Sequence, residues 1–289
     1  MMFDYFVGID WSGAKGKTHR GISVFTASIG GDLPLKQQPP NNKKAFSRAD
    51  VIDYLEALSG QGKVLAGIDF AFAYPINEQG HYFPDLPDDR LQPVDVSSLW
   101  ALIDEINSGG DDYYGGLIWD HPILGSYYNA PAGRKGARFQ SRRRLTEVRA
   151  RSVKAPSPTF NCVGPAGVGT GSLAGMRLCH HFAKTAAIWP FFEKPQSALT
   201  LVEIFPSYYF KQAGISPIGS DYTKPASLNK ALAYFGSAPV ADDFNAEGPD
   251  ADDADALISA AALRHLSKER QIWNVPPQAR REGWIFGVK

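Results

Sequence analysis

Two stretches of this sequence decide the fold: Tyr5-Phe6-Val7-Gly8-Ile9-Asp10 and Val64-Leu65-Ala66-Gly67-Ile68-Asp69. Each is a short apolar run that ends in Gly-Ile-Asp, a pattern typical of a buried strand. Each Asp shares a strand face with the Gly two residues before it, and the small Gly leaves room for a metal, a phosphate or another carboxylate. Neighbouring strands would therefore bring two carboxylates together, which favours a shared cation or a shared proton. Alternatively, each Asp only begins a turn.

The rest of the chain predicts an α/β fold in one domain, residues 1–289. The other predicted elements are a hairpin strand over 21–29, a weak strand before Pro39, a helix over 47–60, a helix from Ser172 to Pro190, a strand over 199–205, a short helix over 228–235 and a long helix over 250–267. Ser47 and Asp50 resemble a capping box at the start of the first helix. Between 75 and 171 the regular pattern breaks down, so this stretch is predicted to be an irregular insertion.

Composition excludes several classes of protein. The chain has 289 residues, 44% hydrophobic residues and a formal net charge of zero, so no global charge indicates a nucleic-acid or membrane partner. Cys162 and Cys179 are too few for a disulfide framework and lack metal-ligand spacing. The N-terminus lacks a signal pattern and no apolar run reaches membrane-spanning length, which favours a cytoplasmic protein without a membrane partner.

Acidic residues begin the last predicted helix, at Asp250-Ala251-Asp252-Asp253-Ala254-Asp255. On a helix, Asp252 and Asp255 lie near the edge of the apolar stripe and could face the end of a sheet. Asp250 and Asp253 are better suited to capping and to the helix dipole. Alternatively, all four Asp residues only complement the start of the helix.

Glu203 ends another apolar strand, Leu199-Thr200-Leu201-Val202-Glu203. Strand-end carboxylates lie where open α/β sheets bind ligands. The predicted catalytic set is Asp10, Asp69, Glu203, Asp252 and Asp255. Oxygen ligands without His or Cys favour Mg²⁺ or Mn²⁺, and two such ions can activate a water and stabilise the leaving oxygen of a phosphodiester.

The order of these motifs resembles the ribonuclease H-like superfamily, and Asp252-x-x-Asp255-Ala-Leu is similar to the last motif of RuvC-type Holliday junction resolvases. The segments 8–13, 68–75, 168–176 and 203–207 look closer still to a family of uncharacterised predicted ribonuclease H-like nucleases. The resemblance covers residues 3–73 and about 172–266.

The resemblance implies a ribonuclease H-like three-layer fold, with a five-stranded mixed sheet flanked by helices and a long insertion after the fourth strand. It implies two-metal hydrolysis, with the metal held by Asp10, Asp69, Asp252 and Asp255. RuvC-type resolvases carry Glu on the fourth strand, where this chain has the shorter Asp69. Glu203 is an additional acidic position, either a ligand or an outer base. Because resolvase-like enzymes work as dimers, a homodimer is a further expectation.

A basic segment lies inside the insertion, with nine Lys or Arg residues and one Glu between 134 and 154. Such a run can neutralise several phosphates, and Tyr127, Tyr128 and Phe139 could stack on bases. The predicted nucleic-acid-binding residues are Arg134, Arg138, Arg142, Arg143, Arg144, Arg149 and Arg151. Alternatively, the segment is a solvated helix or an oligomer contact. The Gly-rich stretch 164–172 either holds an anion at the start of the next helix or acts as a hinge.

These observations predict a metal-dependent nuclease that binds DNA or RNA and requires Mg²⁺ or Mn²⁺. One alternative is a phosphotransferase of the sugar-kinase or ATPase type, which shares the sheet topology and binds phosphate on its first hairpin. Another alternative is a non-catalytic module that binds nucleic acid or a protein partner.

Overall fold

The two Gly-Ile-Asp strands are neighbours. The computed structural model describes residues 3–164, 167–250 and 252–289. In it, β1 (Tyr5–Asp10) pairs in parallel with β4 (Val64–Ile68), and Gly8 aligns with Gly67. The backbone N–H of Asp69 donates to the carbonyl of Ile9 at 3.0 Å, so Asp10 and Asp69 leave the sheet side by side. The two strands are therefore neighbours that run in the same direction, and their carboxylates reach the same edge of the sheet.

The main sheet in the described part of the chain has six strands in the order β3-β2-β1-β4-β8-β7. The other strands are β2 (Ser23–Ser28), β3 (Leu35–Lys36), β7 (Ala187–Ile188) and β8 (Leu199–Glu203). β2 is antiparallel to β1 and β3, whereas β4, β8 and β7 are parallel to one another. The predicted α/β class with a mixed sheet flanked by helices is confirmed, but the prediction of five strands is wrong. Helix α4 ends at Phe182 rather than near Pro190, which frees Ala187 and Ile188 to pair with the edge of β8.

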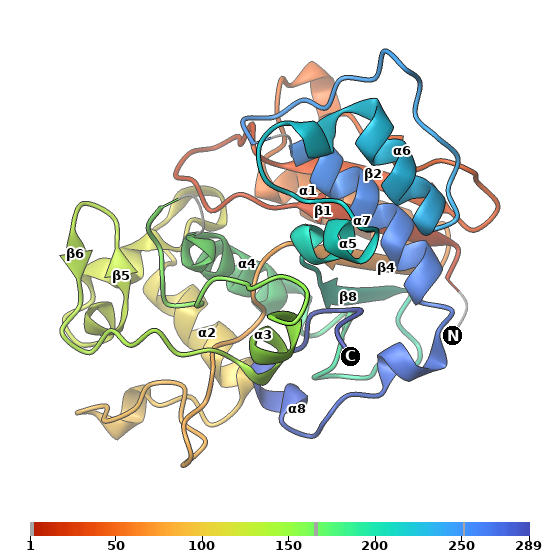
Figure 1. The fold of residues 1–289 in the computed structure, drawn as a ribbon. Coiled ribbons are helices and arrows are strands. Elements are labelled where there is room, and N and C mark those ends of the chain that lie inside the picture. The colour runs from red at the N-terminus through yellow and green to blue at the C-terminus, as the bar shows by residue number, and fades with distance from the viewer. Residues whose placement is uncertain (1–2, 165–166, 251) are drawn as a thin grey trace.

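Helices cover both faces of this sheet (Figure 1). The longer helices are α1 (Arg48–Ser59), α2 (Val96–Ile106), α4 (Val168–Phe182), α5 (Pro206–Gln212), α6 (Pro225–Tyr234) and α7 (Asp252–Leu266). Alternate side chains of β1 and β4 enter two separate apolar cores, one with α1, α2 and α4 and the other with α5, α6 and α7. Asp10 and Asp69 continue the register of the face that α7 covers.

Two predicted helix starts have different outcomes. The capping box at the start of α1 is confirmed: the Asp50 backbone N–H donates to the Ser47 hydroxyl at 3.1 Å, and the Ser47 backbone N–H donates to the Asp50 carboxylate at 2.8 Å. Helix α4 begins at Val168, one turn before the predicted start at Ser172. No helix in the described ranges is long and apolar enough to cross a membrane.

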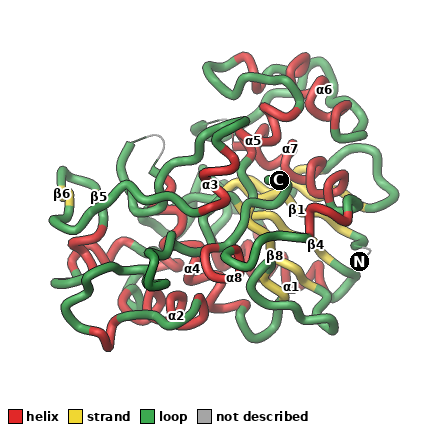
Figure 2. Tube along the Cα trace, turned by 60° about the horizontal axis from the view of Figure 1, so that its bottom comes forward, coloured by secondary structure: helices red, strands yellow, loops and turns green. Residues whose placement is uncertain are grey.

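The insertion, residues 75–171, is more ordered than its sequence predicts. It holds α2, α3 (Leu145–Ala150), β5 (Asn129–Ala130), β6 (Arg134–Lys135) and the short helical turns η2 (Asp89–Leu91), η3 (Asp111–Tyr113), η4 (Gly116–Asp120) and η5 (Leu124–Tyr127). Its α2, β5 and β6 lie together to one side of the main sheet in both views of the fold (Figures 1 and 2). The remaining short helices of the chain are η1 (Pro40–Asn42), η6 (Asp221–Thr223), η7 (Arg270–Trp273) and α8 (Ala279–Glu282).

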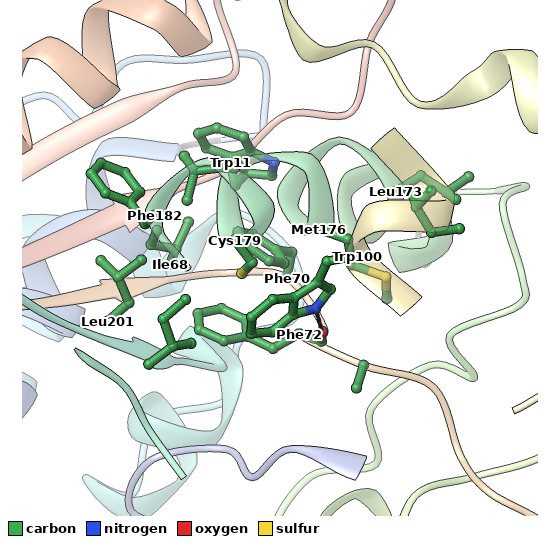
Figure 3. Packing of buried hydrophobic residues seen from close by; sticks show 14 of the residues in the cluster. Trp11, Ile68, Phe70, Phe72, Trp100, Leu173, Met176, Cys179, Phe182 and Leu201 are labelled. Atoms are coloured by element: carbon green, nitrogen blue, oxygen red, sulfur yellow. Dashed lines mark hydrogen bonds between the residues drawn. The ribbon is translucent and has the colours of Figure 1, made fainter. Parts of the chain in front are cut away.

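Aromatic side chains join the insertion to the sheet. Trp100 on α2 is fully buried, and its indole N–H donates to the Phe72 carbonyl at 2.7 Å, just after β4 (Figure 3). Phe72 stacks on Phe70, with ring centroids 4.7 Å apart, and Met176 of α4 lies in the same apolar cluster. The irregular sequence pattern therefore reflects short elements around an aromatic core rather than a loose loop.

Gly8 and Gly67 leave room for helix α7 and its neighbouring side chains rather than for a ligand. A Cβ atom on Gly8 would lie 2.2 Å from the Ala256 carbonyl oxygen and 2.5 Å from the Ala260 nitrogen. A Cβ atom on Gly67 would lie 2.4 Å from Ile204 and 2.8 Å from Leu263. The expectation that these Gly residues clear space for a metal or a phosphate is wrong, because helix backbone and apolar side chains fill that space.

We expect Gly8→Ala to destabilise the protein by about 3 kcal/mol, at the upper end of overpacking costs, because the new methyl group meets helix backbone that no rotamer change can move. Gly30→Ala is the matched control, since no described atom lies within 4 Å of its added Cβ. Urea unfolding of both variants measures the difference. Equal, small effects would contradict the close packing of α7 on β1.

Candidate active-site cleft

A cleft of about 900 Å³ opens at the ends of β1, β4 and β8. The predicted acidic residues Asp10, Asp69, Glu203, Asp252 and Asp255 all line it. Three come from the strand ends and two from the first turn of α7. The parallel strands place their carboxyl ends at one edge of the sheet, and α7 brings its N-terminus to the same edge.

The start of α7 is held against the end of β1 by polar contacts. Asp10 pairs with Ser23 across the first hairpin, and the Ser23 hydroxyl donates to Asp253 at 2.6 Å. Lys36 also donates to Asp253, at 2.7 Å. Asp253 is therefore a buried structural anchor that points away from the cleft, as its helical position predicts. Ala251 lies outside the described residues.

The carboxyl groups on the cleft floor have raised pKa values. Burial, and then the negative charges of Asp255, Asp69 and Asp252, raise the pKa of Asp10 well above its usual range. Burial and the nearby Glu203 raise the pKa of Asp69 to about 8. Burial and then the charges of Asp69 and Asp252 raise the pKa of Asp255 well above its usual range. These side chains keep some access to solvent at the floor of the cleft, but protein surrounds them on most sides.

No Lys, Arg or His in the described part of the chain forms an ion pair with Asp10, Asp69, Asp252 or Asp255. The neighbouring carboxyl group of Asp252 contributes to the raised pKa of Asp10. Buried carboxylates without a cationic partner favour protonation or a bound cation.

The donor chemistry of this group fits Mg²⁺ or Mn²⁺, since carboxylate oxygens are the ligands these ions prefer. Across residues 3–164, 167–250 and 252–289, however, no three Asp, Glu, His or Cys side chains are gathered into a ready-made metal site. The carboxylates share one cleft without forming a compact ligand set. A bound cation would have to draw them together.

Glu203 differs from the four Asp residues, because an arginine neutralises it. Arg144 donates to both carboxylate oxygens of Glu203, at 2.5 and 2.7 Å, and to Glu147 at 2.7 Å. The Phe72 backbone N–H also donates to Glu203, at 3.1 Å. Arg144 is only 1% exposed. The prediction that Arg144 binds nucleic acid is wrong, because buried carboxylates occupy its guanidinium. Among the described residues, Glu203 therefore forms an ion pair, unlike Asp10, Asp69, Asp252 and Asp255.

The other arginines of the basic segment do not line the cleft. Arg142 donates to the carbonyls of Pro75 and Tyr82, and Arg143 donates to the carbonyl of Pro156. These two arginines are half-buried and bind the backbone of the insertion. The remaining four, Arg134, Arg138, Arg149 and Arg151, are exposed. The segment is therefore not one continuous phosphate-binding arm.

The predicted stacking residues are also divided. Tyr127 and Tyr128 are buried, and their hydroxyl groups bond to the carbonyl of Pro84 and to Tyr74, so the prediction that they stack on bases is wrong. Phe139 is half-buried beside Lys135, whose ammonium lies 5.6 Å from the ring centroid.

The connection between β1 and β2 forms part of the cleft wall, and its importance is only partly visible in the sequence. Lys15 and Arg20 line the cleft from this connection. The fully buried Arg48 holds it by donating to the carbonyls of Ser12 and Ala14, at 2.7–2.9 Å. Arg20 is missed by motif analysis, but its position between a strand-end Asp and the antiparallel partner strand predicts that it lies near the carboxylates.

The Gly-rich stretch also reaches the cleft. Gly167, Val168, Thr170 and Gly171 line it at the start of α4, whereas Pro165 and Ala166 lie outside the described residues. A Cβ atom on Gly13 would lie 2.3 Å from the Thr170 carbonyl carbon, so the first hairpin packs directly on this helix start.

A scan against protein-family models finds no family that matches this chain, and searches of curated proteins and of solved structures find no similar protein. We therefore base the functional proposal on the chemistry of the cleft and on the sequence motifs that line it.

We expect the metal-free protein to lose stability as pH rises from about 4 to about 8. The folded pKa of Asp69 lies above its usual 3.8, so folding favours the protonated form; that stabilisation is complete at low pH and is lost as pH approaches about 8. One pKa unit corresponds to about 1.4 kcal/mol, so the loss of stability should reach at least about 2 kcal/mol.

Urea unfolding in EDTA at several pH values measures this loss of stability. Asp69→Asn should flatten the pH dependence and the exposed control Asp53→Asn should not; parallel curves for all three proteins would refute the burial of this carboxyl group.

We expect Arg144→Met to destabilise the protein by about 3–5 kcal/mol, because it leaves Glu203 buried without its cation. Adding Glu203→Gln should restore part of the loss. Arg151→Met, on the exposed part of the same segment, should cost less than about 0.5 kcal/mol. Chemical unfolding compares the three variants, and a small effect of Arg144→Met would show that the ion pair is not buried as described.

Proposed function

We propose that this chain is a metal-dependent nuclease with a ribonuclease H-like fold that hydrolyses phosphodiester bonds of DNA or RNA. One observation carries the proposal: Asp10, Asp69, Asp252 and Asp255 converge on one cleft floor, and none has a cationic partner among the described residues. Structural carboxylates elsewhere in the same molecule, such as Asp253, are paired with a cation. Unpaired buried carboxylates are costly, and a bound divalent cation removes that cost.

The sheet supports the ribonuclease H-like part of the proposal. The order β3-β2-β1-β4-β8 combines an antiparallel hairpin at β1 and β2 with parallel β4 and β8. Helix α7 follows these strands in sequence and packs on β1. The resemblance implies a mixed sheet flanked by helices, and this strand arrangement supports that part of the proposal. The short edge strand β7 is an addition to the implied sheet.

Asp10, Asp69, Asp252 and Asp255 would hold Mg²⁺ or Mn²⁺. When bound, a pair of such ions would activate a water molecule and stabilise the leaving oxygen of the phosphodiester. The resemblance assigns the metal to these four residues, and the pairing of Glu203 with Arg144 supports leaving Glu203 out of the ligand set.

The remaining residues prepare the floor of the cleft. The N-terminus of α7 provides a positive dipole end beside Asp252 and Asp255, which opposes part of the pKa rise that burial causes. Arg144 neutralises Glu203, so less negative charge lies beside Asp69 than five free carboxylates would give. Trp11 and Phe70 form an apolar wall next to the strand ends and limit water access on that side.

We expect cleavage of labelled DNA or RNA to require Mg²⁺ or Mn²⁺ and to fall about 100-fold or more in Asp10→Asn. Loss of a residue that only orients a metal ligand costs about 10–100-fold, and loss of a ligand should cost at least as much. The assay uses single-stranded, duplex and branched substrates, and Asp242→Asn is the exposed control outside the cleft.

Calorimetric titration with Mg²⁺ or Mn²⁺ supplies a readout that does not depend on activity. Asp10→Asn and Asp255→Asn should weaken binding of the ion, and Asp242→Asn should not. ATP turnover without cleavage of any nucleic acid would instead favour a phosphotransferase. Binding of nucleic acid without metal-dependent cleavage would favour a non-catalytic module.

A further inference from the structure

We propose that the cleft takes a single nucleic-acid strand and that Lys15, Arg20 and Lys154 bind its phosphates. This inference rests on the proposed nuclease function and names its substrate class. The binding surface then differs from the one that the sequence predicts. The strand would follow the cleft and meet only Lys154 of the basic segment, rather than its exposed arginines. The chemistry recognised is a run of phosphodiesters with unpaired bases.

Positive charge reaches the cleft from two distant parts of the chain. Lys15 and Arg20 belong to the connection between β1 and β2, whereas Lys154 follows α3 in the insertion. Lys15 and Arg20 are exposed, and Lys154 is half-buried. Among the described residues, none of the three forms an ion pair, although carboxylates line the same cleft. These cations are therefore available to an anionic ligand that reaches over the carboxylates.

The basic segment 134–154 offers fewer free cations for phosphate binding than its sequence indicates. Arg144 donates its hydrogen bonds to Glu203 and Glu147. Arg142 and Arg143 donate theirs to backbone carbonyls. Arg134 pairs with Asp120. Four of the nine positive charges of this segment are thus engaged by groups of the protein itself.

The size and lining of the cleft favour a single strand. A volume of about 900 Å³ lies within the range of pockets that hold small ligands, so the cleft takes a few nucleotides and a duplex would have to lie across its mouth. Phe205 is half-buried and lines the cleft together with the cations, so its ring is the aromatic face open to a base, whereas Trp11 and Phe70 are buried in the cleft wall. Aromatic faces beside positive charge are the usual means by which proteins hold unpaired bases and their backbone.

Several hydrogen bonds hold the wall that carries two of the cations. Arg48 fixes the carbonyls of Ser12 and Ala14, and Asp112 accepts from the Arg48 backbone N–H at 2.9 Å and pairs with the buried His19 at 2.8 Å. Lys15 and Arg20 extend from this fixed connection. A prearranged wall lowers the entropy cost of binding a flexible strand.

The experiment compares three triple variants that each lose three positive charges. The cleft variant is Lys15→Ala, Arg20→Ala, Lys154→Ala; the arginine-segment variant is Arg134→Ala, Arg138→Ala, Arg151→Ala; the surface control is Lys44→Ala, Lys184→Ala, Lys268→Ala. A fluorescein-labelled single strand and a blunt duplex of the same sequence are the probes. Binding is measured by anisotropy in an Asp10→Asn background with Mg²⁺, over a series of salt concentrations. Cleavage is measured with the same charge changes in the wild-type background, and thermal unfolding verifies that each variant folds.

We expect the cleft variant to bind the single strand about tenfold or more weakly than the parent protein and to cleave it correspondingly more slowly. Its salt dependence should fall by about two in log–log slope, the value for three lost contacts to a single strand. The surface control and the arginine-segment variant should change binding less than about threefold. The parent protein should prefer the single strand to the duplex.

Equal or stronger binding and cleavage of the duplex would overturn the inference and leave the nuclease proposal standing. A larger loss in the arginine-segment variant than in the cleft variant would overturn it in the same way. If no nucleic acid of any form is bound or cleaved, the inference and the proposed function both fail.

Discussion

The close contact between α7 and β1 is the interaction on which the candidate site depends. Gly8 lets the helix backbone approach the strand, and any Cβ atom there would collide with Ala256 and Ala260. The approach is close enough for Ser23 on the neighbouring strand to bond to Asp253 in the first turn of the helix. That anchor puts the helix N-terminus over the carboxyl end of β1. Asp10 and the acidic residues of α7 therefore share one cleft although about 240 residues separate them.

The molecule distributes its cations unevenly among buried carboxylates. Lys36 neutralises Asp253, and Arg144 neutralises Glu203, each within about 2.7 Å. Asp10 and Asp255 receive no such partner within the described residues, and burial and mutual repulsion raise their pKa values. A protein selected only for stability would have no reason to leave these charges unbalanced, because each is costly when ionised. This contrast, inside one small region, is the strongest physical argument for a cation at the cleft floor.

The insertion is part of the site rather than an appendage. Through Arg144 it contacts the end of β8, and the Leu145 backbone N–H donates to Glu282 near the C-terminus at 3.0 Å. Glu282 also accepts from the Ile76 backbone N–H at 2.8 Å, where the insertion begins. The start of the insertion and its helix α3 are therefore both tied to the side chain of Glu282. The wall that carries Lys154 is held in place by these contacts, and so the shape of the cleft depends on residues far from its acidic floor.

The sequence alone determined the elements whose signals are local. The repeated apolar runs ending in Gly-Ile-Asp predict two buried strands with carboxylates at one edge, and the capping pair Ser47 and Asp50 predicts the start of α1, because backbone geometry and short-range hydrogen bonds decide these features. Only the tertiary structure decided which charges are free. Arg144 and Arg151 look alike in a basic run, yet one is buried against Glu203 and the other is exposed. The sequence likewise suggests that Gly8 leaves space for a ligand, but in the structure helix α7 fills that space. The partners of a charge and the occupant of a gap come from segments distant in sequence, and no local pattern records them.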